Sequence, residues 1–200
     1  HSRRTTRACC LLPDRHNRMA AAVESASEDT TVVGDESRTK LPQLKLSLGD
    51  IHVNNIGQLR KLNEATFPVR YADKFYKEIP TLLTDFTQFA YFGGFAIGAV
   101  CGRVEPTADP ARKQLYIMTI GVLVAYRDRG VGRYLLDYLL TNARKRPELS
   151  LVYLHVQTNN DAALAFYKNA GFETIGKIVG YYKRIEPPDC YVVAKQLNGG

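Results

Sequence analysis

The sequence contains no apolar run near the roughly 18–20 residues that a helix needs to cross a bilayer, so no transmembrane helix is expected. Cysteine is also scarce. The four copies are Cys9, Cys10, Cys101 and Cys190, and they form no Cys-x-x-Cys pair and no Cys/His ligand spacing. This argues against a zinc centre, and we expect no metal site. Four scattered cysteines in 200 residues fit a reducing compartment better than a disulfide scaffold.

Acidic residues are fewer than basic ones. Lys and Arg number 27 against 20 Asp and Glu, which gives a net charge of +7. Most of the excess lies in residues 41–200, which hold 20 basic and 14 acidic residues. Such a surplus suggests an anionic partner, although solubility alone would also account for it. The basic residues are dispersed and form no nucleic-acid recognition motif, so direct binding of nucleic acid is not expected.

Residues 1–40 are rich in Ser, Thr, Arg, Ala and Glu and show no sustained apolar periodicity. Such a segment cannot bury enough surface to offset the entropy of ordering, so we expect a disordered tail followed by one domain over residues 41–200. Met19 is followed by three alanines and would make a plausible start, which would put residues 1–18 upstream of the natural protein. The competing interpretation is a transit peptide, because residues 1–18 hold five Arg and one acidic residue.

From residue 44 onward, the apolar residues recur at the spacings typical of strands and helices in turn. Strands are expected over residues 44–48, 89–92, 95–104, 114–124, 151–156, 172–182 and 190–196. Helices are expected between Asn54 or Asn55 and Pro68, around residues 73–77, around residues 135–140, and from a cap at residues 159–161 to residue 170. Gly171 stands where a helix-ending residue with positive φ belongs. This order predicts a mixed α/β layered fold, with a parallel strand pairing about the last helices.

The most informative motif is Arg127-x-x-Gly130-x-Gly132, between a long apolar strand and a helix with one apolar side. Glycines allow the backbone to approach a ligand closely, and the first N–H groups of a helix lack internal partners and attract anions. Arg129 and Arg133 add positive charge. The motif therefore predicts a phosphate site, although a helix start that happens to hold two glycines is the plainer alternative. The third glycine of a dinucleotide fingerprint and the Gly-Lys-Ser/Thr of a P-loop are absent.

This loop resembles the acetyl-CoA loop of the GNAT N-acetyltransferase superfamily, and a later segment resembles the second cofactor segment of the same superfamily. The later segment reads Asn160-Asp161-x-Ala163-x-x-Phe166-Tyr167-x-x-x-Gly171-Phe172. Four further signatures are together similar to N-terminal acetyltransferases of the NatE group, over roughly residues 44–197. They are Phe67-Pro68-Val69-x-Tyr71, Tyr116-Ile117-Met118-Thr119, Tyr153-Leu154-His155-Val156-Gln157 and Tyr181-Tyr182-x-x-Ile185-Glu186-Pro187. The resemblance implies an α/β GNAT fold, with a mixed, mostly antiparallel central sheet of about seven strands and helices on both faces.

In that family, the α-amine of a protein N-terminus attacks the thioester of acetyl-CoA directly. The resemblance implies substrates that begin with Met followed by a hydrophobic or other non-acidic residue. It also implies that Tyr116 and His155 act as bases through ordered water. Because an imidazole titrates in a suitable range and a tyrosine with a pKa near 10 does not, we expect His155 to take the proton and Tyr116 to position water or the amine. Without the resemblance, each would be interpreted as a residue packed within a strand.

The resemblance assigns two further groups of residues. It places acetyl-CoA against Ile120, Val122, Val124, Arg127, Arg129, Gly130, Val131, Gly132, Arg133, Asn160 and Tyr167. It places the substrate peptide against Phe67, Pro68, Val69, Tyr71, Met118, Tyr181, Tyr182 and Ile185. The strand over residues 119–124 should bulge or splay and offer backbone groups to the pantetheine arm. Asp128 stands where the family often has a basic residue, so we expect its carboxylate to turn to solvent. Plainer interpretations stay open, such as core packing for Phe67 and Val69, a helix cap for Asn160 and a helix-face aromatic for Tyr167.

Two other functions are compatible with the same fold. A lysine or small-amine acetyltransferase would share the coenzyme loop, although the Tyr181-Tyr182 pair favours a chain terminus as substrate. A protein that serves mainly as a binding subunit would keep the fold without depending on turnover. The resemblance implies docking onto the NatA complex, with its large auxiliary subunit and catalytic partner, at the ribosome. It implies a location in the cytoplasm, and secondarily in the nucleus, in preference to a plastid.

Overall fold

The computed structural model of this protein describes residues 44–197. The sequence-based expectations of a tail over residues 1–40 and of a start at Met19 therefore lie outside the described residues. Within residues 44–197, no helix is both long enough and apolar enough to cross a membrane.

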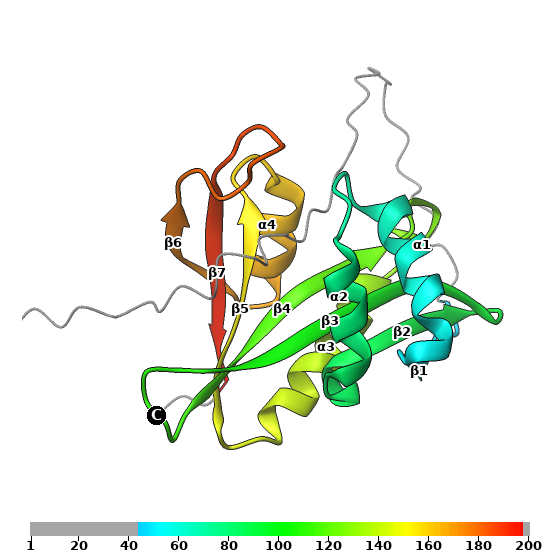
Figure 1. Ribbon diagram of the computed structural model, residues 1–200, viewed down its shortest axis with the longest axis horizontal. Helices are drawn as coiled ribbons and strands as arrows, with labels where there is room; N and C mark the ends of the chain where they lie inside the picture. The colour runs from blue at the N-terminus through cyan, green and yellow to red at the C-terminus, as the bar shows by residue number, and fades with distance from the viewer. Residues whose placement is uncertain (1–43, 198–200) are drawn as a thin grey trace, which may run out of the picture.

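A seven-stranded sheet forms the centre of the described region (Figure 1). In spatial order its strands are β1 (Ser47–Asp50), β2 (Thr87–Phe92), β3 (Phe95–Pro106), β4 (Lys113–Val122), β5 (Leu149–Gln157), β7 (Cys190–Gln196) and β6 (Glu173–Ile178). Neighbouring strands are antiparallel, except that β4 and β5 are parallel. The mixed, mostly antiparallel sheet predicted from the sequence is therefore confirmed.

Helices cover both faces of this sheet, as predicted (Figure 1). They are α1 (Ile56–Thr66), α2 (Asp73–Glu78), α3 (Val131–Arg144) and α4 (Asp161–Asn169). Leu59 of α1 and Phe75 of α2 belong to one buried cluster, whereas Leu135 of α3 and Ala163 of α4 belong to the other. Apolar residues recur three or four positions apart along α3, so this helix can bury a single side against the sheet. Helix α3 also provides the crossover that parallel β4 and β5 require.

Most strands begin or end one to four residues from their predicted bounds, and two of these differences have a clear position in the fold. The first strand begins at Ser47, not at residue 44. Strand β4 ends at Val122, because the N–H of Tyr126 donates to the carbonyl of Leu123 (2.8 Å) and closes a 3₁₀ turn at Val124–Tyr126. Val124, which the sequence places in the strand, therefore lies in this turn.

The segment after α4 also differs from its prediction. Strand β6 ends at Ile178 and does not continue to residue 182, because Gly180 adopts a left-handed φ of +64° that breaks the extended chain. Tyr181 and Tyr182 consequently lie in a loop. Gly171 has the positive φ expected after α4 (+78°), which confirms its role at the helix end.

The parallel pair of strands separates midway along its length. Strand β4 pairs with β5 only from Lys113 to Tyr116, after which β4 stays with β3 while β5 continues beside β7. The register of β3 with β4 shifts at Cys101 and Gly102, opposite Met118. Figure 1 shows the two halves of the sheet diverging from this point. The edge of β4 that faces β5 thus has no strand partner beyond Tyr116 in the described part of the chain.

Candidate active site

The candidate catalytic pair lies where β4 and β5 separate. Tyr116 is the last β4 residue to pair with β5, opposite Tyr153, and His155 follows Tyr153 by two positions on the same side of the strand. Nδ1 of His155 lies 3.3 Å from Oη of Tyr116 and 3.3 Å from Oη of Tyr181. All of these side chains are buried. The fold thus gathers one imidazole and two phenols at the fork.

Burial sets the protonation states of this group. It lowers the pKa of His155 to about 4, so the imidazole is neutral at pH 7. Burial, and after it the nearby Tyr181 hydroxyl, raises the pKa of Tyr116 well above 10, so this phenol keeps its proton. Tyr116 can therefore donate a hydrogen bond but is not a base at neutral pH. A neutral His155 with its proton on Nε2 presents the Nδ1 lone pair, which supports His155 as the proton acceptor.

Further tyrosines form a wall beside the pair. The Tyr181 ring stacks on the His155 imidazole, with centroids 4.6 Å apart and planes 25° apart, and Tyr182 meets Tyr181 edge-on at 4.9 Å. Burial raises the pKa of Tyr71 well above its usual value, and the nearby Tyr182 hydroxyl raises it further. Tyr71 belongs to the loop after α1 and Tyr182 to the loop after β6, so these two loops meet here. Oη of Tyr182 is buried and has no hydrogen-bond partner within residues 44–197, which leaves it available to a ligand.

Most of the residues predicted to contact the peptide gather beside this wall. One cluster of apolar side chains contains Phe67, Val69, Tyr71, Tyr116 and Met118. On the facing loop, Ile185 packs with Tyr181 and Tyr182. Pro68 differs from the rest in being exposed. The two loops therefore bring apolar side chains and phenolic hydroxyls together beside the pair, and we call this apolar surface the slot.

Hydrogen bonds hold the tyrosine-bearing loop over residues 179–189 in place. The N–H of Gly180 donates to Oδ1 of Asp189 (2.9 Å), and the N–H of Tyr182 donates to the carbonyl of Pro188 (2.7 Å). The side-chain amide of Gln157 donates to the carbonyl of Pro187 (2.9 Å). Sequence reasoning assigned no role to Gln157. The sequence feature that could have indicated such a role is an amide side chain at the end of an otherwise apolar strand.

The phosphate loop has the backbone geometry that the motif predicts. Gly130 is the N-cap of α3 with a left-handed φ of +80°, and no side chain caps the helix there. The first N–H groups of α3 therefore face outward without a capping side chain, which is the usual arrangement of an anion site. Arg127 is anchored to the loop, because its Nε donates to the carbonyl of Val122 (3.1 Å).

The other charged side chains of the loop differ from one another. Arg133 lies on the surface, where its Nε contacts both carboxylate oxygens of Asp137 at 2.8 Å. Arg129 is half-buried, and Asp128 is exposed with a left-handed φ of +58°. Arg133 is thus engaged along α3, while Asp128 faces solvent as expected. Val131 is buried and Gly132 half-buried, both in the first turn of α3.

The remaining predicted coenzyme contacts lie along β4 and α4. Ile120 is buried and Val122 half-buried on the open stretch of β4, whereas Val124 is exposed in the turn that follows. Oδ1 of Asn160 accepts from the N–H of Ala163 (3.0 Å), so its carbonyl group caps α4 as the plainer interpretation predicted. Oη of Tyr167 is buried without a hydrogen-bond partner in the described region.

These features fit a coenzyme A thioester. Its amide-bearing pantetheine arm can complete the unpaired edge of β4, its diphosphate can meet the N-terminus of α3, and the buried Tyr167 hydroxyl can receive a partner. Acyl transfer to an amine needs a reactive acyl donor, a proton acceptor and a slot that holds the amine nearby. All three can be provided within this one region.

Comparison with known proteins agrees with this geometry. The family model described as "Acetyltransferase (GNAT) family" matches residues 56–172. N-alpha-acetyltransferase 50 of Danio rerio is 44% identical over 154 residues, which are 77% of this chain and 90% of that protein. "Probable N-acetyltransferase san" of Drosophila melanogaster is 41% identical over 76% of this chain and 82% of its own. The structure of Arabidopsis thaliana Naa50 in complex with the bisubstrate analogue CoA-Ac-MVNAL superposes with a TM-score of 0.71 at 43% identity, covering 76% of this chain and 99% of that one.

Proposed function

This chain belongs to the acetyltransferase (GNAT) family and is an acetyl-CoA-dependent N-terminal acetyltransferase, and we propose that it acts on peptides that begin with Met followed by a hydrophobic or other non-acidic residue. The observation that carries this specificity is the apolar slot beside His155 and Tyr116, formed by the loops after α1 and β6. The relative from Arabidopsis thaliana binds an analogue whose peptide part begins Met-Val.

The chemistry of the slot favours an apolar first side chain. Phe67, Val69 and Met118 offer aliphatic and aromatic surface, and burying a Met side chain against such surface contributes about 1.5–3 kcal/mol. An acidic second side chain would lose hydration against the apolar side chains of this slot. Discrimination therefore follows from burial of apolar groups.

The tyrosine loop also favours a chain terminus over a lysine in mid-chain. Tyr181 stacks on His155 and so closes one side of the reacting centre, while Tyr182 leaves a buried hydroxyl unpaired. A peptide that enters with its first residue leading can bond to that hydroxyl through its backbone. A polypeptide that presented a mid-chain lysine would continue in both directions from it and would meet the Tyr181 ring stacked on His155.

Acetyl-CoA supplies an activated acyl group, and the protein has to hold the amine and manage its proton. A free α-amine has a pKa of about 7.7–8.0, so part of the substrate is already neutral at physiological pH. A His155 with a pKa of about 4 is too weak a base to deprotonate the ammonium form efficiently. The nitrogen becomes far more acidic as it bonds to the acyl carbon, and Nδ1 of His155 can then take the proton through water or Tyr116. This timing differs from the early deprotonation that the sequence suggested.

A panel of peptides tests this proposal. Initial rates are measured by mass spectrometry for Met-Leu, Met-Val and Met-Glu peptides that also carry one internal lysine, and for the same peptides with the α-amine blocked. We expect fast acetylation of Met-Leu and Met-Val at the α-amine, slow acetylation of Met-Glu, and almost none of the blocked peptides. Equal rates on free and blocked Met-Val would instead identify a lysine acetyltransferase.

We propose in addition, on family resemblance, that the protein docks onto the NatA complex at the ribosome in the cytoplasm. Its net charge of +7 is compatible with association with ribosomes but does not select a partner. Sedimentation of cell extracts tests this. The chain should travel with ribosomes and with the large NatA subunit, and depletion of that subunit should return it to the light fractions.

A further inference from the structure

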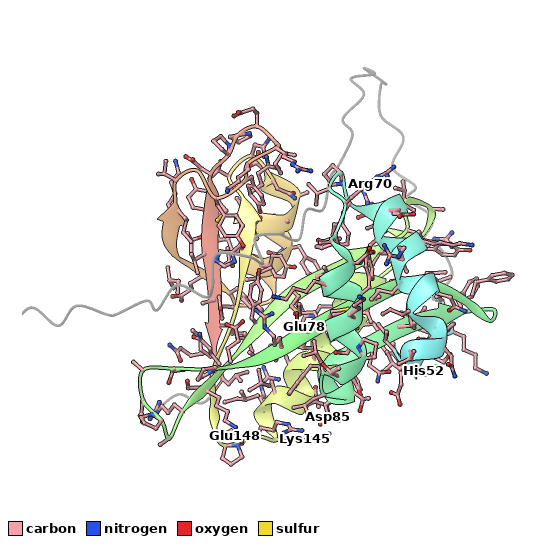
Figure 2. The ribbon with its side chains drawn as sticks, viewed as in Figure 1. His52, Arg70, Glu78, Asp85, Lys145 and Glu148 are labelled. Carbon is pink, nitrogen blue, oxygen red and sulfur yellow. The ribbon has the colours of Figure 1, made fainter. Side chains whose placement is uncertain are left out.

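A chain of half-buried ionic groups crosses the sheet next to the reacting centre. Nη1 of Arg103 donates to Oε1 of Glu78 at the end of α2 (2.8 Å), and its Nε and Nη2 both reach Oε1 of Glu105 (2.9 and 2.5 Å). The second oxygen of Glu105 accepts from the Tyr153 hydroxyl (2.6 Å). Figure 2 labels Glu78, which is the last residue of α2. The series Glu78–Arg103–Glu105–Tyr153, here called the ionic frame, thus joins α2, β3 and β5.

The ionic frame is sheltered from water. The side chains of Arg103, Glu78 and Glu105 are 20%, 24% and 11% exposed, and Tyr153 is 8% exposed. Two carboxylates share one guanidinium, so the Tyr153 hydroxyl provides the remaining hydrogen bond that Glu105 needs. A charged group buried to this degree is costly unless its partners are well placed, which favours a single arrangement of the frame.

The ionic frame encloses Tyr116. The rings of Tyr153 and Tyr116 have centroids 5.0 Å apart, and the Arg103 guanidinium carbon lies 5.8 Å from the centroid of the Tyr116 ring. Tyr153 also touches His155, edge to face at 5.9 Å. Tyr153 therefore contacts both members of the candidate catalytic pair, and its hydroxyl donates to Glu105.

We propose that Tyr153, held by Glu105, is a positioning residue that keeps Tyr116 and His155 in their reacting arrangement. This rests on the proposed function. The bond from the Tyr153 hydroxyl fixes the tilt of its ring, and the ring in turn limits the tilt of its two neighbours. Neither Tyr153 nor Glu105 is among the residues assigned above to the peptide or to acetyl-CoA, so we expect the frame to act on turnover and not on binding.

Tyr153→Phe removes only the hydroxyl and leaves Glu105 paired with Arg103, so the protein should still fold. We expect kcat to fall by about 2- to 13-fold, the range that corresponds to one hydrogen bond of about 0.5–1.5 kcal/mol. The KM values for acetyl-CoA and peptide should change less than about twofold. The matched control is Tyr91→Phe on β2, which removes the hydrogen bond from the Tyr91 hydroxyl to Gln58 of α1 and should leave kcat unchanged.

A double-mutant cycle tests whether Glu105 acts through Tyr153. Glu105→Ala leaves Arg103 paired with Glu78 and should lower kcat about as much as Tyr153→Phe. The combined variant should then be no slower than the slower single variant, because both changes remove one interaction. Glu105→Gln keeps an oxygen that can accept from Tyr153 and should recover part of the lost kcat.

The ¹⁵N resonances of the His155 imidazole give a readout that does not depend on turnover. They should move in Tyr153→Phe and stay in place in Tyr91→Phe, with the assignment taken from their loss in His155→Gln. Unchanged resonances and an unchanged kcat in Tyr153→Phe, beside an active wild type, would overturn the positioning role and leave the enzyme activity standing. A wild type that acetylates no peptide would refute the proposed substrates instead, and the imidazole resonances would then decide the role of Tyr153.

Discussion

The buried imidazole of His155 makes a specific prediction for the pH dependence of turnover. With a pKa of about 4, His155 is about 97% neutral at pH 5.5, whereas an imidazole with the ordinary value of 6.5 would be about 10% neutral. The only group that must lose a proton between pH 5.5 and 8 is then the α-amine of the peptide. The logarithm of kcat/KM should therefore rise with a slope of about 1 and level off near pH 8.

The assay measures acetylated Met-Val peptide by chromatography from pH 5.5 to 9 at saturating acetyl-CoA. Each sample is returned to pH 7.5 afterwards to confirm that activity recovers in full. An imidazole that titrated near 6.5 would double the slope below that pH and cost a further factor of about ten at pH 5.5. A measured slope of 2 below pH 6.5 would thus refute the conclusion that burial keeps His155 neutral.

Four other outcomes follow from the structure. The pKa of His155 is lower in the folded protein than in the unfolded chain, so the unfolded chain binds more protons. The free energy of unfolding should therefore fall by about 3 kcal/mol between pH 6.5 and pH 4, which urea titrations would reveal. His155→Gln should flatten this dependence. Gly130→Ala forces a side chain into a left-handed φ at a cost of about 1–2 kcal/mol. Acetyl-CoA binding measured by calorimetry should weaken while the peptide KM stays constant, and an unchanged acetyl-CoA affinity would argue against this loop as the diphosphate site. Gln157→Ala frees the loop over residues 179–189 and should raise peptide KM about 5-fold without altering acetyl-CoA affinity, in steady-state assays. Leu135→Ala empties a fully buried position against the sheet and should lower the free energy of unfolding by about 2–5 kcal/mol in denaturant titrations.

Much of the fold could be predicted because its signals are local. The apolar side of α3, the double glycine of the β2–β3 turn and Gly171 after α4 each depend on a few neighbouring residues. Residues 172–182 were misjudged for the same reason. Their composition suits a strand, and only the left-handed Gly180 ends it.

The candidate site was less accessible to sequence reasoning. Tyr116 and His155 could be named from family resemblance, but the contact of His155 with Tyr116 spans 39 positions and its contact with Tyr181 spans 26. The bond from Tyr153 to Glu105 spans 48 positions, and no local pattern encodes it. A clue was available in Arg103 and Glu105, because opposite charges two positions apart lie on the same side of a strand. Their partners could be found only once the strands were placed in order.

The fork between β4 and β5 leaves the protein with an incomplete hydrogen-bond ladder at its very centre. Such a gap is filled when a molecule with its own amides is inserted, so the guest acts as an eighth strand for part of its length. Loading the protein with acetyl-CoA should therefore stiffen both halves of the sheet together. At one hundred times its Kd, a ligand that binds only the native state adds about 2.7 kcal/mol to stability, so thermal melting should report occupancy of the gap even with a catalytically inactive variant.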